Sequence, residues 1–262
     1  MLGAIIGDIV GSIYELDNIK TKEFPFFEDR MEYTDDSILT IATADWLIHG
    51  GYAGDYYLRY ANMYPYPMGS YGTMFVQWIH KANRGQIQPY NSCGNGSAMR
   101  IAPVGWAFEN EEDLLKAAKM SAECTHNHPE GIKGAQAVAC TIWAIRNGYT
   151  KDDIKEWLES ECKYNLDKTY DELKRTHKFE CICQNSVPAA FICWYYSTSY
   201  EDCIRKAVSL GGDADTEAAI AGAFAAADPN TEVPEELTCD VTRFFSMDFM
   251  DVLKKFHEKY EV

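Results

Sequence analysis

The 262-residue sequence predicts an all-α fold, and three observations support this. Apolar residues recur three and four positions apart in several windows, as on the buried face of an amphipathic helix. Capping residues stand just before such windows. No alternating apolar and polar run bounded by hairpin turns indicates a strand. Since no repeat, low-complexity tract or Gly/Ser linker divides the chain, we expect residues 1–262 to form a single compact domain.

The helices are predicted in chain order. The apolar residues 1–6 indicate a buried helix start rather than a signal peptide, because no basic region precedes them and Asp8 interrupts them. Apolar faces follow at Ile38, Ile41, Ala42 and Trp46; Ala135, Val138, Ala139 and Ile142; Val187, Ala190, Phe191 and Trp194; and Ile204, Ala207 and Val208. Ser199, with Asp202 three residues later, predicts the start of the last of these helices. Pro229 predicts a stop after the alanine-rich stretch before it.

Three segments interrupt this pattern and are predicted loops. Residues 64–73 are rich in Tyr, Pro and Gly, and residues 89–96 contain Asn, Ser and two glycines. The charged residues 159–183 form the third, because their periodicity is weak.

Composition argues against two classes of partner. A net charge of -16 and a pI near 4.7 repel a phosphate backbone, so we expect no binding of bulk nucleic acid. The longest run of small apolar residues, 218–227, has about half the length of a membrane span, so we expect no membrane partner. A monomer is the expected state.

The nine cysteines lack the spacing of a disulfide framework and mostly lie in apolar stretches. A reduced, cytoplasmic protein is therefore expected. Cys181 and Cys183 form a Cys-x-Cys pair, for which a metal or redox role is the less favoured alternative.

Two acidic clusters stand at predicted helix starts. Thr34, Asp35 and Asp36 precede one helix, and the motif Gly211-Gly212-Asp213-Ala214-Asp215-Thr216 precedes another. Either cluster alone is explained by helix capping and by the helix dipole. Together they form a matched set of oxygen ligands, which suits Mg²⁺ or Mn²⁺ and, with four converging carboxylates, a pair of such ions. Zinc is disfavoured because neither cluster has a neighbouring Cys or His.

Two further segments contain polar residues of possible function. The segment Gly94-Asn95-Gly96-Ser97-Ala98-Met99-Arg100 offers backbone N–H groups to an anion such as phosphate, although taken alone a plain helix-entry loop is the favoured interpretation. In Thr125-His126-Asn127-His128-Pro129, a histidine that donates a hydrogen bond to a ligand is favoured over one that binds metal, and Pro129 favours a turn.

These segments, in this order, resemble the ADP-ribosylglycohydrolase family over nearly the whole chain. The opening Gly7-Asp8-Ile9-Val10-Gly11 with Glu15 is similar to the family's first helix, and Thr34-Asp35-Asp36 to its first metal motif. Residues 94–100 are similar to its ligand loop, residues 125–129 to its histidine loop, and residues 211–216 to its second metal motif. Five modest matches in order make the resemblance specific.

The resemblance implies an orthogonal helical bundle with two Mg²⁺ ions at the base of a cleft, Mn²⁺ being a possible substitute. It implies metal ligation by Thr34, Asp35, Asp36, Asp213, Asp215 and Thr216. It implies ADP-ribose binding by Ser92, Cys93, Asn95, Gly96 and His126, with Glu15 on a flap over the metals. The sequence departs from the family at Ala214, which need not be a ligand, and at Cys93, which puts aromatic stacking there in doubt.

The implied activity is Mg²⁺-dependent hydrolysis of the N- or O-glycosidic bond between ADP-ribose and a protein or small acceptor. Glu15 is the candidate acid/base, and activation of water by Asp35 or Asp36 stays open. The acidic cleft and chain favour a cationic, arginine-linked acceptor over serine-linked or O-acetyl-ADP-ribose. A metal-dependent nucleotide phosphohydrolase, which would release phosphate or AMP, and a non-catalytic ADP-ribose-binding module are the alternatives.

Overall fold

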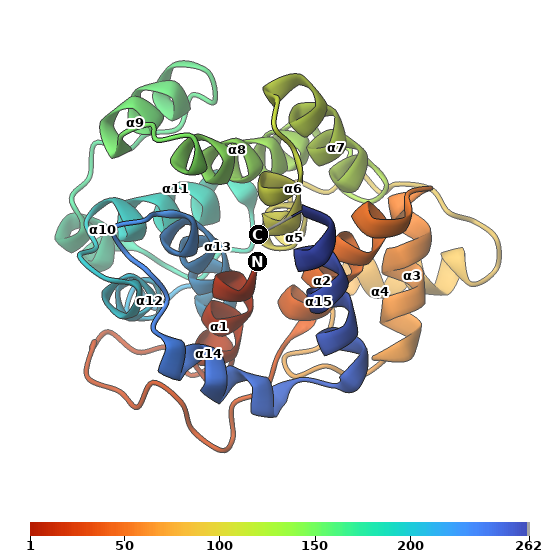
Figure 1. Cartoon of the computed structure of the whole chain (residues 1–262), viewed down its shortest axis with the longest axis horizontal. Coiled ribbons are helices and arrows are strands. Elements are labelled where there is room, and N and C mark those ends of the chain that lie inside the picture. The colour runs from red at the N-terminus through yellow and green to blue at the C-terminus, as the bar shows by residue number, and fades with distance from the viewer. Residues whose placement is uncertain (261–262) are drawn as a thin grey trace.

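Helices account for the regular structure of residues 1–260, the part of the chain that this computed structural model describes (Figure 1). The helices are α1 (Leu2–Gly11), η1 (Ser12–Tyr14), α2 (Asp35–His49), α3 (Ala53–Met63), α4 (Thr73–Ala82), α5 (Gly96–Met99), α6 (Ala102–Ala107), α7 (Glu111–Glu123), α8 (Pro129–Arg146), α9 (Lys151–Ser160), α10 (Tyr170–Thr176), α11 (Cys183–Tyr195), α12 (Tyr200–Val208), α13 (Ala214–Ala227), α14 (Glu235–Val241), η2 (Thr242–Phe244) and α15 (Met247–Tyr260). Within residues 1–260 there is no strand, and the extended pairing is a single bridge between Gly94 and Ile182. The all-α prediction is confirmed.

The predicted helical faces lie in α2, α8, α11 and α12, and the expected caps form. The Thr34 side chain accepts a hydrogen bond from the Asp36 amide at 3.2 Å, and Ser199 accepts one from the Asp202 amide at 3.1 Å. α13 ends at Ala227, two residues before the proline that predicted its end. The apolar start of the chain is α1, which is buried from Gly3 onward.

The loop expected at residues 159–183 contains a helix, α10. Its N-terminus has a capping box, in which Thr169 and Glu172 exchange side-chain and backbone hydrogen bonds. Only Tyr170 and Leu173 of this seven-residue helix are buried. Two apolar positions are too few to show a 3.6-residue period, which is why the sequence pattern missed the helix.

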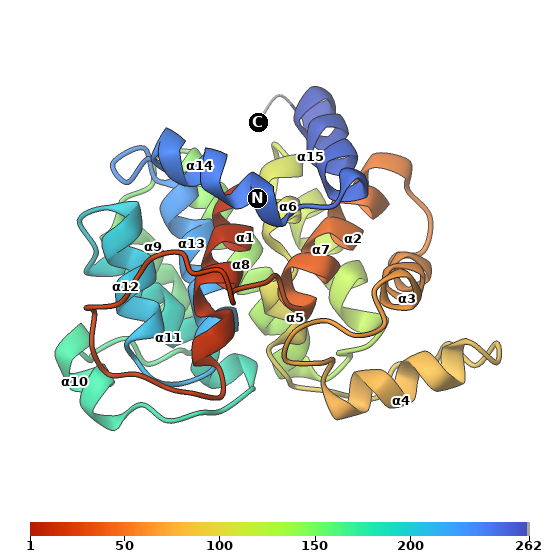
Figure 2. The same ribbon diagram turned by 90° about the horizontal axis from the view of Figure 1, so that it is seen from below.

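α1 and α13 pack with their backbones almost in contact, side by side in both views (Figures 1 and 2). A Cβ atom on Gly7 would lie 2.1 Å from the carbonyl oxygen of Ala218, and one on Gly11 would lie 2.5 Å from that of Ala214. Only glycine fits at such positions, because any side chain would meet backbone. The contact sets α1 directly against the first turns of α13.

The remaining helices surround this pair. α11 and α12 pack on α13, and α8 contacts both α11 and α13. The C-terminal segment runs from α14 across to α15, which lies against α2 (Figure 1). Buried apolar residues from all these helices form one contiguous core. Among residues 1–260, no helix is both long and apolar enough to cross a membrane.

We expect Gly7→Ala to reduce the free energy of unfolding by about 3 kcal/mol, because the added methyl group must push α1 away from the Ala218 carbonyl. Gly72→Ala is the control, since a Cβ at Gly72 meets nothing within 4 Å. Urea unfolding of both variants measures the difference. Equal stability of the two variants would contradict the close backbone contact.

Candidate functional site

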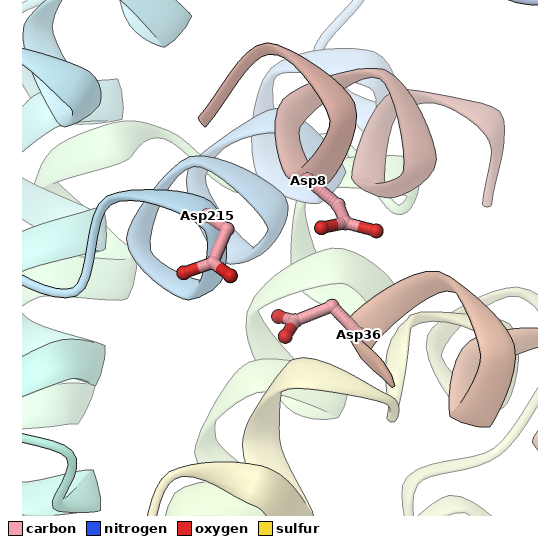
Figure 3. Close-up of side chains that lie close together, drawn as sticks. All are labelled: Asp8, Asp36 and Asp215. Atoms are coloured by element: carbon pink, nitrogen blue, oxygen red, sulfur yellow. The ribbon is translucent and has the colours of Figure 1, made fainter. Parts of the chain in front are cut away.

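Three helices bring carboxylates together in the middle of the molecule. Asp8 of α1, Asp36 at the start of α2 and Asp215 at the start of α13 point toward one another (Figure 3). One oxygen from each lies within 4.8 Å of the other two, and all three residues are buried. A second such triad consists of Glu15, Asp213 and Asp215, again with oxygens within 4.8 Å. Asp215 belongs to both, so the triads adjoin.

Asp8 is the member that residue-by-residue prediction left out. Its Oδ2 accepts hydrogen bonds from the amides of Thr34 and Ser37 at 3.0 and 3.1 Å, and from the Ser37 hydroxyl. Its Oδ1 accepts one from the Thr34 hydroxyl at 2.6 Å. Asp8 therefore holds the N-terminus of α2 against α1, in addition to facing the other carboxylates. The sequence feature that could have identified Asp8 as a site residue is its position as the one acid in an otherwise apolar helix.

One oxygen of the Asp36 carboxylate lacks a hydrogen-bond partner. Its Oδ2 lies 3.3 Å from the hydroxyls of both Thr34 and Thr216, whereas its Oδ1 is buried and has no hydrogen-bond partner. A buried carboxylate oxygen without a donor is costly unless a cation binds it. Together with the surrounding oxygen donors, this atom shows that the residues fit a hard divalent cation.

The second triad lies beside a loop. Glu15 follows η1, is partly buried, and its Oε2 would lie 2.7 Å from a Cβ atom on Gly69, in the loop before α4. Asp213 precedes α13, and its Oδ2 accepts a hydrogen bond from Asn95 Nδ2 at 2.7 Å. The same amide group donates to Ser186 Oγ at 2.9 Å. Asn95, predicted to bind substrate, thus directly supports an acidic residue.

The six acids of this region, Asp8, Glu15, Asp35, Asp36, Asp213 and Asp215, are called the carboxylate cluster below. Burial raises the pKa of Asp8 to about 6. Burial, together with repulsion by Asp213 and Asp8, raises the pKa of Glu15 to about 7. Burial and neighbouring carboxylates also hold the pKa values of Asp35, Asp36 and Asp215 well above their usual range. Since crowded carboxylates cannot all stay ionised without counter-charge, the cation-free cluster retains protons that a divalent cation could replace.

The residues predicted as metal ligands fall into two groups. Asp36, Asp213 and Asp215 belong to the two triads, with the hydroxyls of Thr34 and Thr216 bonded to Asp36. Asp35 is only partly buried and lies at the cleft wall outside both triads. Whether each of them binds a cation stays a prediction.

A cleft of about 710 Å³ opens above the carboxylate cluster, and the predicted ADP-ribose residues line it. These are Ser92, Cys93, Asn95, Gly96 and His126. The loop that contains most of them is fixed by the Gly94–Ile182 bridge, in which the Asn95 amide donates to the Cys181 carbonyl at 3.1 Å and the Cys183 amide to the Cys93 carbonyl at 3.0 Å. The cleft thus joins the predicted anion loop to the acids. Residues 181–182 and the loop before α4 also line the cleft. The sequence analysis had not predicted that either segment contributes to a binding site.

The histidine segment is divided between the cleft and a helix start. His126 is buried and lines the cleft, with its ring centroid 5.7 Å from that of Tyr90. His128 caps α8, and its Nδ1 accepts the Glu130 amide at 3.1 Å. Pro129, from which a turn was predicted, occupies the first position of α8, where its missing N–H costs nothing. Neither histidine belongs to the acidic triads of residues 1–260.

A further buried acid, Glu217, lies on α13 one turn after Asp213. Glu217 Oε1 lies 2.6 Å from His177 Nε2, while Glu217 Oε2 is buried without a partner. Burial raises the pKa of Glu217 to about 7, against the lowering effect of His177. His177 directly follows α10. Through its contact with Glu217, the segment predicted as a loop packs against the first turn of α13.

Comparisons with known proteins agree with this arrangement. A family model described as ADP-ribosylglycohydrolase matches residues 1–261. ADP-ribosylhydrolase ARH3 of Mus musculus is 26% identical over 311 residues, covering 90% of this chain and 84% of that protein. ADP-ribosylhydrolase ARH3 of Homo sapiens is also 26% identical, covering 87% and 83% respectively. A solved structure described as an ADP-ribosylglycohydrolase-related protein complex has a TM-score of 0.73 at 21% identity, over 99% of this chain and 95% of that chain, which shows the shared fold.

The raised pKa values predict how pH affects the cation-free protein. Between the ordinary glutamate pKa of 4.5 and the folded Glu15 pKa of about 7, the folded state binds more protons than the unfolded chain. Stability in EDTA should therefore fall from about pH 5 to pH 8, and Mg²⁺ should reduce this fall because bound cations favour ionised carboxylates.

Urea unfolding across this pH range, with EDTA or with Mg²⁺, measures the effect. Asp215→Asn should lessen the dependence in EDTA, whereas Asp171→Asn, at an exposed position on α10, should leave it unchanged. Stability in EDTA that rises toward pH 8 would refute this description of the carboxylate cluster.

Proposed function

Because this chain belongs to the ADP-ribosylglycohydrolase family and is a hydrolase of ADP-ribosyl conjugates, we propose that the cleft above the carboxylate cluster is its active site. The reaction is hydrolysis of the glycosidic bond between ADP-ribose and its acceptor, and it depends on divalent cations. One observation carries this proposal: two oxygen triads share Asp215 at the floor of a cleft lined by the predicted ADP-ribose residues.

The cation pair is proposed to be Mg²⁺, with Mn²⁺ as a substitute. Asp8, Asp36 and Asp215 would hold one ion, and Glu15, Asp213 and Asp215 the other. Thr34, Asp35 and Thr216 complete the predicted ligand set, next to these triads. When bound, such cations orient the sugar hydroxyls and stabilise the charge that develops as the bond breaks.

Proton transfer is assigned to a carboxylate at the edge of the carboxylate cluster. Glu15 lines the cleft and is partly buried, so its carboxylate can reach a bound substrate and accept or donate a proton. Asp35 is the alternative because it also lines the cleft and is only partly buried. Asp36 is less suited, since it is 2% exposed and lies deep in its triad.

ADP-ribose binding is assigned to the loop between α4 and α5 and to His126. Ser92, Cys93 and Gly96 line the cleft beside the Gly94–Ile182 bridge, which fixes the loop before substrate arrives. Asn95 contributes by holding Asp213, because its amide donates to that carboxylate. A preformed loop of this kind lowers the entropic cost of binding a flexible ligand.

We propose one catalytic domain spanning residues 1–262, which acts as a monomer in the cytoplasm. The contiguous core supports a single domain. All nine thiols are free, which suits a reducing compartment.

Chelation of divalent ions should abolish release of ADP-ribose, and Mg²⁺ or Mn²⁺ should restore it. Asp215→Asn should reduce kcat/KM by about 10²-fold or more because it removes the shared ligand of both triads. Asp171→Asn, with the same charge change at an exposed site, should match the wild type. Chromatography of the products measures both outcomes. Full turnover in EDTA would exclude cation dependence, and release of AMP or phosphate would favour a phosphohydrolase.

Arginine-linked ADP-ribose is the proposed preferred substrate, because an acidic cleft on a chain of charge -16 attracts a cationic acceptor. We expect its kcat/KM to exceed that of serine-linked ADP-ribose and O-acetyl-ADP-ribose, with the difference shrinking as salt increases. Rates for the three conjugates at matched ionic strength give the comparison. A salt-independent preference for the serine or acetyl conjugate would show that pocket shape overrides charge.

A further inference from the structure

Arg100 is a fully buried cation beside the cleft, where it contacts neutral groups. Its Nη2 donates to the Ser121 carbonyl at 2.7 Å and to Thr125 Oγ1 at 2.9 Å. Its guanidinium lies 3.8 Å from the ring centroid of Tyr57. Since a guanidinium has only donors, the Thr125 oxygen must be the acceptor in their contact.

The Thr125 hydroxyl therefore keeps its own proton to donate, and the Tyr90 phenol, His126 Nδ1 and the Ala122 carbonyl are within reach. His126 Nδ1 is at 2.7 Å, and the Ala122 carbonyl is at 3.5 Å. That carbonyl already accepts two backbone amides, from Thr125 at 3.1 Å and from His126 at 2.7 Å. The occupied Ala122 carbonyl and the short Oγ1–Nδ1 distance of 2.7 Å both favour donation of the hydroxyl proton to His126 Nδ1.

An imidazole that accepts at Nδ1 has its own proton on Nε2 while it is neutral. That nitrogen faces the glycines of the cleft loop: a Cβ on Gly96 would lie 3.1 Å from it, and one on Gly94 would lie 3.5 Å from it. Burial and the charge of Arg100 hold the pKa of His126 well below its usual range, so the ring stays neutral. A protonated Nε2 cannot ligate a cation, which agrees with the all-oxygen triads.

We propose that Arg100 and Thr125 are positioning residues that fix His126 as the Nε2–H tautomer, so that it donates a hydrogen bond to an oxygen of the bound ADP-ribosyl group. The identity of the ligand rests on the proposed function. The tautomer does not, since it is inferred from contacts within the protein.

Nitrogen-15 NMR of histidine-labelled protein tests the tautomer directly, with His126→Gln used for assignment. The wild type should show an unprotonated Nδ1 and a protonated Nε2 at His126. Thr125→Val keeps the shape but removes the hydroxyl, so the tautomer preference should be lost, and Thr125→Ser should restore it. A wild-type ring protonated on Nδ1 would overturn the proposal, and this result needs no variant to fold.

Calorimetric titration with ADP-ribose in Mg²⁺ tests the consequence. His126→Phe, which removes the donor, should weaken binding by about tenfold, the weight of a hydrogen bond to a charged ligand, while Thr125→Val, in which about half of the neutral rings still carry the proton on Nε2, should weaken it about twofold. A His126→Phe protein that binds as tightly as the wild type would overturn the donor role. If the wild type itself does not bind ADP-ribose, the proposed function and the donor role both fail, and the NMR result still decides whether Arg100 and Thr125 set the tautomer.

Discussion

The close contact between α1 and α13 is the constraint on which the site depends. Asp8 lies between Gly7 and Gly11, the two glycines whose missing side chains let α1 approach the Ala218 and Ala214 carbonyls. This approach brings Asp8 within reach of Asp215, at the start of α13. Asp8 in turn binds the amides of Thr34 and Ser37, which fixes the start of α2. One backbone contact thus orders three helices and their carboxylates.

The carboxylate cluster opposes the stability that this packing provides. Each buried acid loses hydration, and the raised pKa values of Asp8 and Glu15 show that the neighbouring groups compensate for this loss only in part. Hydroxyls and amides supply part of the compensation, as Asn95 does for Asp213. Some oxygens, such as Oδ1 of Asp36, are left without a partner. We propose that these uncompensated carboxylates are the groups that bind cations.

Much of this architecture could be predicted from local patterns. Thr34 and Ser199 capped the expected helices because capping depends on a few adjacent residues. The cleft residues, including His126, came from motifs matched in order. Asp8 could not be placed by pattern, because its partners are 26 and 29 residues away and no local period reports a contact between helices. The same holds for His177, which meets Glu217 40 residues along the chain, and for the role of Asn95 toward Asp213.

We propose that the acids of α1, η1, α2 and α13 form two adjoining cation sites that share Asp215. Anomalous X-ray diffraction from crystals grown with Mn²⁺ would show these ions. We expect two Mn²⁺ ions, one bound by Asp8, Asp36 and Asp215 and the other by Glu15, Asp213 and Asp215. Absence of Mn²⁺ from these triads at saturating concentration, or its presence only elsewhere on the protein, would rule out the two sites.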